Sequence, residues 1–361
     1  MSAEAVLLVG GQGTRLRPLT LTTPKPLLPV AGVPFLAHQI AMLRDAGVEH
    51  VVLATSYQPQ IFVDTFGDGA GLGVRLTYVE ETEPLGTGGA IGNVAALLES
   101  AADDPVVVLN GDVLSGHDLA GQLAQHEARG ADVTLHLVEV PDARAFGCVP
   151  TDDDGRVLAF LEKMPEPVTS WVNAGAYVFR RSVIDAIPSD RPVSVERERF
   201  PELLAAGASV FAWRETAYWV DLGTPEAFRR ACVDLVTGDA PSHASVPHAV
   251  HSPDALLIGD CVVDPTARVT GGTTVGSDAR VGASAVVDAC VLFDGAVVEA
   301  GAHVVRSVIG AGAHVAADCV LVDAVVGDGA RIGKGNELRS GIRVWPGVEL
   351  SATSVRFSSD G

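Results

Sequence analysis

Short apolar runs alternate with longer amphipathic stretches between residues 5 and 237. Apolar runs of strand length lie at Val6–Val9, Val51–Ala54, Val74–Val79 and Val106–Leu109. Stretches with helical spacing lie at Phe35–Ala46, Gly89–Leu98, Leu119–Arg129 and Pro225–Val236. Strands that alternate with helices predict a Rossmann-like α/β fold, in which helices cover both faces of a mostly parallel sheet. Ligands bind such sheets at the carboxyl ends of the strands, so we expect a site there.

From about residue 253 the pattern changes, and an apolar, mostly aliphatic residue recurs at steps of six residues, with a few steps of five. The series begins with Val263, Val269, Val275, Val281 and Val287 and continues to Leu350. Such a hexapeptide repeat predicts a parallel β-helix, with one inward aliphatic residue per short strand and small residues at the corners. An ordinary β-sandwich would instead show apolar residues with a period of two and turn signals about every 8 to 12 residues.

Residues 238–252 lack periodicity and are rich in Pro, Ser, Ala and His, as a linker would be. The expected organisation is therefore a first domain at 1–237, a linker at 238–252, and a β-helix domain at 253–361 that ends in a short tail.

Composition excludes several classes of protein. No apolar run approaches the ~18 to 20 residues that cross a bilayer, so an integral membrane protein is not expected. The net charge of -20 disfavours nucleic acid as a partner. The first thirty or so residues lack the features of a signal peptide, so we expect a cytoplasmic protein with reduced thiols. The five cysteines form no CxxC pair, so we interpret them as small buried residues rather than as zinc ligands or disulfides.

A Gly-rich string, GGQGTRLRPLT at 10–20, directly follows the first predicted strand. It matches neither a Walker P-loop nor a dinucleotide fingerprint. Two cations accompany it: Arg15 lies inside the string, and Lys25 stands between two prolines in a chain with only three lysines. Backbone N–H groups and cations together favour a triphosphate ligand. The alternative is a tight turn with two solvated cations.

Two aspartates are candidates for holding a metal ion. Asp112 follows an apolar strand at its carboxyl end, and Asp221 follows the aromatic pair Tyr218 and Trp219. Carboxylates from separate segments suit the hard, six-coordinate Mg²⁺ ion. For either residue alone, the alternative role is to cap a turn or a helix.

The strings that accompany these residues resemble the sugar-1-phosphate nucleotidylyltransferases. They are GGQGTRLRPLT, PKPLLPVAG (24–32), PLGTGGA (84–90), NGDV (110–113), FLEKMPEP (160–167), NAG (173–175) and YWVDLGTPEAF (218–228). VSVERERFPELL (193–204) and the ending RVWPGVEL are most similar to the mannose-1-phosphate guanylyltransferases of the actinobacterial type. The resemblance covers nearly the whole chain and implies that the β-helix is left-handed.

The resemblance also implies roles for residues. It places Mg²⁺ between Asp112 and Asp221 and makes Arg15, Lys25, Asp112, Lys163 and Asp221 the catalytic set. The nucleotide would be bound by Gly10, Gly11, Gly13, Thr14, Arg15, Lys25, Glu81, Pro84, Gly86, Thr87 and Gly111. The sugar phosphate would be bound by Asp112, Gly147, Glu162, Lys163, Asn173 and Gly175.

Two of these roles remain open at the level of the sequence. Glu81 only accepts hydrogen bonds, which matches the donors of guanine, but an exposed glutamate at a strand end is the alternative. Glu162 and Lys163 are neighbours that would point to opposite sides of a strand, so a shared ligand requires irregular backbone or different reach. A solvated ion pair is the other interpretation of these two residues.

The reaction implied is attack by mannose 1-phosphate on GTP, giving GDP-mannose and pyrophosphate without a protein nucleophile. Thymidylyl or uridylyl transfer to glucose 1-phosphate is the main catalytic alternative, and a non-catalytic regulatory paralogue is another. A β-helix that adds acyl transfer, with His303 or His314 as base, is less favoured than ordinary solvated corner histidines. The flat faces of a stacked coil suggest a homo-oligomer formed through the β-helix.

Overall fold

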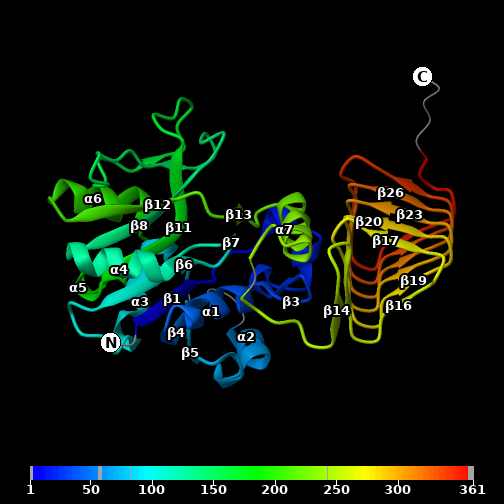
Figure 1. Ribbon diagram of the computed structural model, residues 1–361, viewed down its shortest axis with the longest axis horizontal. Helices are drawn as coiled ribbons and strands as arrows, with labels where there is room; N and C mark the ends of the chain where they lie inside the picture. The colour runs from blue at the N-terminus through cyan, green and yellow to red at the C-terminus, as the bar shows by residue number, and fades with distance from the viewer. Residues whose placement is uncertain (1–2, 56–58, 82, 242, 357–361) are drawn as a thin grey trace. The chain divides into compact units, whose positions relative to one another are not determined.

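The computed structural model describes residues 3–55, 59–81, 83–241 and 243–356, which form two compact units (Figure 1). Unit 1 consists of Met1–Gly11 and Gln39–Trp219, and unit 2 consists of Gln12–His38 and Val220–Gly361. The Gly-rich string therefore leaves unit 1 after Gly11 and continues in the unit that contains the β-helix. The domain limits expected from the sequence follow chain order, whereas these units follow spatial contacts.

The centre of unit 1 is a parallel sheet in the order β5, β4, β1, β6. Its strands are β1 (Ala3–Leu8), β4 (Val48–Thr55), β5 (Arg75–Glu80) and β6 (Pro105–Asn110). Each of these strands overlaps an apolar run of the sequence. β1, β4 and β6 are buried almost throughout, which explains their apolar composition. The predicted α/β fold is confirmed.

Antiparallel strands extend this sheet beyond β6, so the whole sheet is mixed. β11 pairs antiparallel with both β6 and β8, and β12 pairs parallel with β8. These strands and the short ones beside them are β8 (Val133–Glu139), β9 (Gly147–Cys148), β10 (Leu161–Glu162), β11 (Trp171–Arg180) and β12 (Val210–Glu215). The short strand β7 (Val113–Ser115) lies outside this sheet.

Helices pack on the sheet where the sequence shows amphipathic stretches. α4 begins after Asp118, whose side chain accepts the N–H of Gly121, and ends at Gly130, which adopts a left-handed φ of 54°. α3 begins three residues before the predicted helix and ends at Val94, where a 3-10 turn follows. The helices are α1 (Phe35–Asp45), α2 (Pro59–Phe66), α3 (Gly86–Val94), α4 (Leu119–Arg129), α5 (Arg181–Asp185), a π-turn (Val195–Arg199), α6 (Phe200–Ala205) and, in unit 2, α7 (Pro225–Thr237).

Unit 2 contains a parallel β-helix built from three sheets, whose rungs are stacked in Figure 1. The first sheet contains β14 (Ala249–His251), β15 (Ala255–Ile258), β18 (Thr273–Val275), β21 (Val291–Leu292), β24 (Val308–Ile309), β27 (Val325–Val326) and β30 (Arg343–Val344). The second contains β16 (Val262–Val263), β19 (Arg280–Val281), β22 (Val297–Val298), β25 (His314–Val315), β28 (Arg331–Ile332) and β31 (Glu349–Leu350). The third contains β17 (Arg268–Thr270), β20 (Val286–Asp288), β23 (His303–Val305), β26 (Val320–Val322) and β29 (Glu337–Leu338).

The hexapeptide repeat forms a β-helix because each strand places one aliphatic side chain in the interior of the coil. Val275 is aligned with Leu292, and Leu292 with Ile309, in successive coils of the first sheet. These inward side chains are completely or almost completely buried. The strand arrangement is consistent with a left-handed β-helix, as the sequence resemblance implies.

Small residues fill the remaining interior positions. Cys290 and Cys319 lie in the apolar core of the β-helix beside buried alanines, as expected for small buried residues. All five cysteines are free thiols, and Cys261 is only partly buried. Burial raises the pKa of the Cys290 thiol to about 12, so this thiol stays protonated.

Two details differ from the sequence-based expectations. Ala249–His251, inside the expected linker, form β14 and pair antiparallel with β15. His303 and His314 lie on strands β23 and β25 rather than at corners, and His314 contacts Glu299 at 2.8 Å. Within the described residues, no helix has the length and apolar character needed to cross a membrane.

Candidate active site

Asp112 lies in a turn of unit 1 that is fixed by buried groups. The side-chain amide of Gln39 donates to the carbonyls of Asn110, at 2.8 Å, and Val113, at 3.1 Å, on either side of the aspartate. Gly111 donates to the carbonyl of Leu8 at 2.9 Å, and a Cβ on Gly111 would lie only 2.5 Å from that oxygen. This contact explains why glycine precedes Asp112. Sequence reasoning missed Gln39, because a polar residue in a helical stretch carries no special signal.

Gly147 and Glu162 face each other across strands β9 and β10. A Cβ on Gly147 would come within 2.8 Å of Glu162 Oε2, so glycine is needed for the approach of this carboxylate. The next residue, Lys163, has a left-handed φ of 46° and leaves the strand. Its Nζ lies 3.8 Å from Glu162 Oε1. The irregular backbone therefore allows the two side chains to approach each other, which regular strand alternation would prevent.

The NAG segment forms a bulge in β11. Asn173 pairs with Leu137 and Tyr177 with Leu135, so the residues between them are extra relative to β8. Asn173 donates from Nδ2 to the Tyr177 hydroxyl and accepts the N–H of Gly175. These bonds fix the orientation of the Asn173 amide, which retains one further donor and one further acceptor capacity.

The PLGTGGA segment packs closely on the chain near Val193. A Cβ on Gly86, which has a φ of 70°, would lie 2.7 Å from the carbonyl oxygen of Val193. The Thr87 hydroxyl donates to Glu196 at 2.7 Å and accepts the N–H of Val195 at 3.0 Å. Gly86 and Thr87 thus have structural contacts of their own, and their predicted nucleotide contacts remain predictions. Pro84 directly precedes Leu85, the N-cap residue of α3.

Glu81 is buried, with only 8% of its surface accessible to solvent. The alternative interpretation, an exposed glutamate at a strand end, is therefore wrong. Burial raises the pKa of this carboxyl group, while a hydrogen bond from the Leu85 N–H opposes the effect. The side chain therefore closes the turn that leads into α3. Base recognition by Glu81 stays a prediction.

In unit 2, the Gly-rich string folds back on itself. Gly13 adopts a φ of 56°, and a Cβ there would lie 3.0 Å from Thr20 Cγ2 and 3.2 Å from Lys25 Cβ. The Thr20 hydroxyl donates to the Gly13 carbonyl at 2.8 Å. A 3-10 turn, Thr14–Leu16, follows Gly13. Gly10 and Gly11, at the end of unit 1, have exposed backbone.

This folding brings both predicted cations to one carboxylate. Lys25 Nζ lies 3.8 Å from Asp221 Oδ1, and Arg15 Nη2 lies 4.0 Å from Asp221 Oδ2. A Cβ on Gly223 would lie 2.6 Å from Arg15 Nη2, so glycine makes room for the guanidinium. Two positive charges beside one negative charge leave a net positive group, which suits a polyanionic ligand.

The two predicted metal ligands supply suitable donors. Asp112 and Asp221 are partly exposed carboxylates, and hard oxygen ligands are what Mg²⁺ prefers. Asp112 belongs to unit 1 and Asp221 to unit 2. The chemistry of the donors fits the ion, and joint coordination by the two residues remains a prediction.

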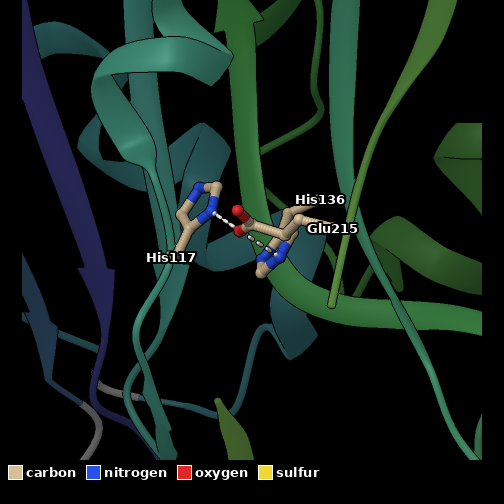
Figure 2. Close-up of side chains that lie close together, drawn as sticks. All are labelled: His117, His136 and Glu215. Carbon is tan, nitrogen blue, oxygen red and sulfur yellow. Dashed lines mark hydrogen bonds and ion pairs between the residues drawn. The ribbon is translucent and has the colours of Figure 1, made fainter. Parts of the chain in front are cut away.

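A buried group that sequence reasoning missed joins three segments of unit 1 (Figure 2). His117 Nδ1 lies 2.5 Å from Glu215 Oε1, and His117 Nε2 lies 2.7 Å from Gln122 Oε1. Gln122 donates its own amide to the carbonyl of Thr134, which orients its oxygen toward the histidine. Both nitrogens of His117 therefore face oxygen atoms, those of Glu215 and Gln122.

His136 lies flat against His117, with ring centroids 3.8 Å apart and planes 14° apart. Its Nε2 is 2.8 Å from Glu215 Oε1, but the approach does not have hydrogen-bond geometry. A metal ion binds a histidine in the plane of its ring, so two nearly parallel, stacked rings cannot share an ion without rotating. In this arrangement the group is a buried His117–Glu215 contact with a stacked neutral histidine rather than a metal centre.

Family models match both parts of the chain. The model described as nucleotidyl transferase matches residues 4–237, and the model described as GMPPB C-terminal domain matches residues 252–356. Mannose-1-phosphate guanylyltransferase of Mycobacterium tuberculosis (strain ATCC 25618 / H37Rv) is 53% identical over 99% of this chain and 98% of its own. Mannose-1-phosphate guanylyltransferase 1 of Arabidopsis thaliana is 34% identical over 85% of this chain and 86% of its own.

Solved structures share the fold of part of the chain. The crystal structure of HddC from Yersinia pseudotuberculosis complexed with GMP-PN has 30% sequence identity and a TM-score of 0.55. The match covers 64% of this chain and 99% of HddC.

The mixed sheet, the Gly-rich turn with its cations and the family match define an enzyme of the nucleotidyltransferase class, whose members generally use a divalent metal ion. Within that class, the chain belongs to the mannose-1-phosphate guanylyltransferase family.

The contacts of Gln39 lead to a prediction about the Asp112 turn. Replacing Gln39 by Leu removes a buried donor from two carbonyls, so the free energy of unfolding should fall by about 1 to 3 kcal/mol. Chemical denaturation measures this change. The control is Gln60→Leu, which removes only an exposed contact with Asp64 and should change stability by less than about 0.5 kcal/mol. Equal stability of the two variants would contradict a structural role for Gln39.

His136 makes the fold sensitive to acid. Burial lowers its pKa to about 4, although the neighbouring Glu215 opposes the shift, so the folded chain binds this proton only near pH 4. The unfolded chain binds it near pH 6.5, and acidification between these values therefore favours unfolding. Because His136→Phe keeps a flat ring and removes the titration, it should reduce the stability loss between pH 7 and pH 5 by about 2 kcal/mol.

Denaturation curves at both pH values test this expectation. His303→Gln, which replaces an exposed histidine, should leave the pH dependence unchanged. An unchanged pH dependence for His136→Phe as well would show that His136 is not the group responsible.

Proposed function

We propose that this enzyme transfers a guanylyl group from GTP to mannose 1-phosphate, with release of pyrophosphate. An oxygen of the sugar phosphate attacks the α-phosphorus of GTP and forms a new P–O bond. The bond from the α-phosphorus to the bridging oxygen breaks, and pyrophosphate leaves with the electron pair. The attacking phosphate is already anionic near neutral pH, so the step requires no protein nucleophile and no general base.

One observation carries the choice of substrates: a relative named for this reaction is similar along essentially its whole length. Guanine as the base is further supported by HddC, which has been crystallised in complex with GMP-PN. A non-catalytic paralogue is disfavoured by the chemistry of the chain, because Arg15, Lys25, Asp112, Lys163 and Asp221 are all present.

In the proposed reaction, the main task of the protein is to hold two polyanions together against their repulsion. Arg15 and Lys25 would bind the β- and γ-phosphates that leave, with Gly10, Gly11, Gly13 and Thr14 offering close backbone approach. Lys163 would orient the attacking phosphate, and its exposed ammonium group is able to reach a ligand. Glu162, Asn173, Gly147 and Gly175 would recognise the sugar.

Asp112 and Asp221 would hold Mg²⁺. When bound, the ion supplies positive charge that offsets the phosphate charges in the transition state. Each aspartate contributes carboxylate oxygens of the kind that this ion accepts.

The base would be read near Glu81, Pro84, Gly86, Thr87 and Gly111. The carboxylate of Glu81 already accepts one backbone N–H, and a carboxylate has further acceptor sites for the donors of guanine. Uracil and thymine present only one ring N–H between two carbonyls, so the proposal favours GTP over UTP and dTTP.

We also propose that the enzyme acts in the cytoplasm as a homo-oligomer. Five free thiols fit a reducing compartment. The second and third sheets of the β-helix present partly exposed side chains on flat faces, such as Val262, Val286 and Val320. Flat faces of this kind suit self-association.

A matrix of nucleoside triphosphates against hexose 1-phosphates tests the choice of substrates. With pyrophosphate release as the readout, GTP with mannose 1-phosphate should give the highest kcat/KM, by tenfold or more over the other pairs. Preference for dTTP or UTP with glucose 1-phosphate would replace this proposal by its main alternative. Release of pyrophosphate from no pair would contradict it.

The lysines of the chain provide a matched test of the triphosphate site. Lys25→Ala removes a largely buried ammonium group near Asp221 and should lower kcat by about 10² to 10³-fold, because charge on the leaving phosphates is no longer neutralised. Lys334→Ala removes an exposed lysine that contacts Asp318 at 3.2 Å and should leave kcat within about twofold. Equal rates for the two variants would contradict the role given to Lys25.

A further inference from the structure

One face of the β-helix is covered, although it points away from the core of the coil. Side chains of the first sheet that alternate with the inward row are buried to at least 94%, namely Leu256, Thr274, Val291, Val308 and Val325. On the second sheet, Arg280, Arg331 and Glu349 occupy the corresponding outward positions and are exposed. The first sheet therefore has a binding partner within the folded chain.

Within unit 2, α7 and the segment Gln12–His38 contribute to this cover. Phe228 of α7 packs edge-on against Phe293, with ring centroids 6.1 Å apart. The backbone of Gly32, from the segment Gln12–His38, lies so close to Ile258 that a Cβ would come within 2.3 Å of its side chain. The segment that carries Arg15 and Lys25 is thus packed on the first sheet.

Arg343 follows Val325 in register at the end of this outward row, and its side chain is exposed. Its Nη1 donates to the carbonyl of Arg15 at 2.8 Å and to the carbonyl of Arg17 at 2.7 Å. These two carbonyls lie at the C-terminal end of the 3-10 turn, where backbone acceptors have no partner within the turn and a cation is favoured. Arg343 therefore caps this turn from the β-helix.

A second contact holds the same segment. The Thr22 hydroxyl donates to Asp328 Oδ2 at 2.6 Å, while Asp328 Oδ1 accepts the N–H of Ala311 at 2.9 Å. Asp328 is itself fixed by the corner of the coil. The β-helix thus holds the backbone of the Gly-rich string at Arg15, Arg17 and Thr22, on the chain between the two cations.

From these contacts we infer that Arg343 is a positioning residue for the triphosphate, and that the β-helix takes part in nucleotide binding by fixing the backbone of the Gly-rich string. This inference rests on the proposed function, in which Arg15 and Lys25 bind the triphosphate. Arg343 acts through the carbonyl of Arg15 and leaves the guanidinium of Arg15 to the ligand. Arg343 therefore affects binding of the nucleotide and does not affect binding of the sugar phosphate.

Arg343→Ala should raise KM for GTP at least tenfold and change KM for mannose 1-phosphate less than twofold. It should also weaken binding of inorganic tripolyphosphate at least fivefold, measured by titration calorimetry on the full chain. Arg343→Lys retains a cationic donor and should recover part of the loss. Thr22→Val should weaken binding in the same direction by a smaller factor, and it provides a second variant if Arg343→Ala unfolds.

The control is Arg331→Ala, which removes an outward arginine of the second sheet that contacts only Glu349 among the ion pairs of the described residues, at 3.7 Å. It should leave both KM values and the melting temperature unchanged. Unchanged tripolyphosphate binding in Arg343→Ala would overturn the inference. An equal rise in both KM values, with a lowered melting temperature, would also overturn it, because that result indicates a general structural role.

The proposed function and this inference fail in distinguishable ways. If the unsubstituted enzyme makes no GDP-mannose but Arg343→Ala still weakens tripolyphosphate binding, the substrates are wrong and the positioning role stands. If GDP-mannose is made and tripolyphosphate binding does not depend on Arg343, the substrates stand and the positioning role is wrong.

Discussion

A guanidinium group that binds two backbone carbonyls helps to fix the Gly-rich string on the β-helix. Arg343 reaches Arg15 and Arg17 across 328 and 326 residues of sequence. The string that these carbonyls belong to is short and rich in glycine, and Arg15 and Arg17 are exposed, so contacts from the β-helix add to the local hydrogen bonds that hold its conformation. Because the β-helix supplies donors and a packed surface, a segment that begins beside the central sheet becomes part of the C-terminal unit.

The charges explain why such a segment needs support from elsewhere. Arg15 and Lys25 lie near the same carboxylate, Asp221, and the three side chains together carry an excess positive charge. Without a ligand, the two cations repel each other, and the carboxylate of Asp221 moderates this repulsion. A rigid backbone keeps the cations in place before a polyanion arrives, so that less ordering is required when it binds.

The sequence predicted those features that depend on local patterns. The helix expected from spacing at Leu119–Arg129 agrees with α4 at both ends, where the structure shows the Asp118 cap and the left-handed φ of Gly130. The hexapeptide spacing predicted the β-helix, since each short strand must place one aliphatic residue inside.

Contacts between distant residues could not be predicted in the same way. Gln39 lies 71 residues from Asn110, and His117 lies 98 residues from Glu215. In the sequence these are ordinary polar residues, and only the fold gives them buried partners. Glu81 was ambiguous for the same reason, because the turn to Leu85 that buries it is not evident from the strand pattern.

Native-state hydrogen exchange in increasing denaturant tests the central claim most directly. The backbone amides of Leu16, Leu27 and Leu28 donate hydrogen bonds within the segment Gln12–His38. If this segment folds as part of unit 2, their exchange should approach that of β24 and β27 of the β-helix as denaturant rises. If their exchange instead merges with that of β1 and β6 of unit 1, the segment folds with the central sheet and the account is wrong.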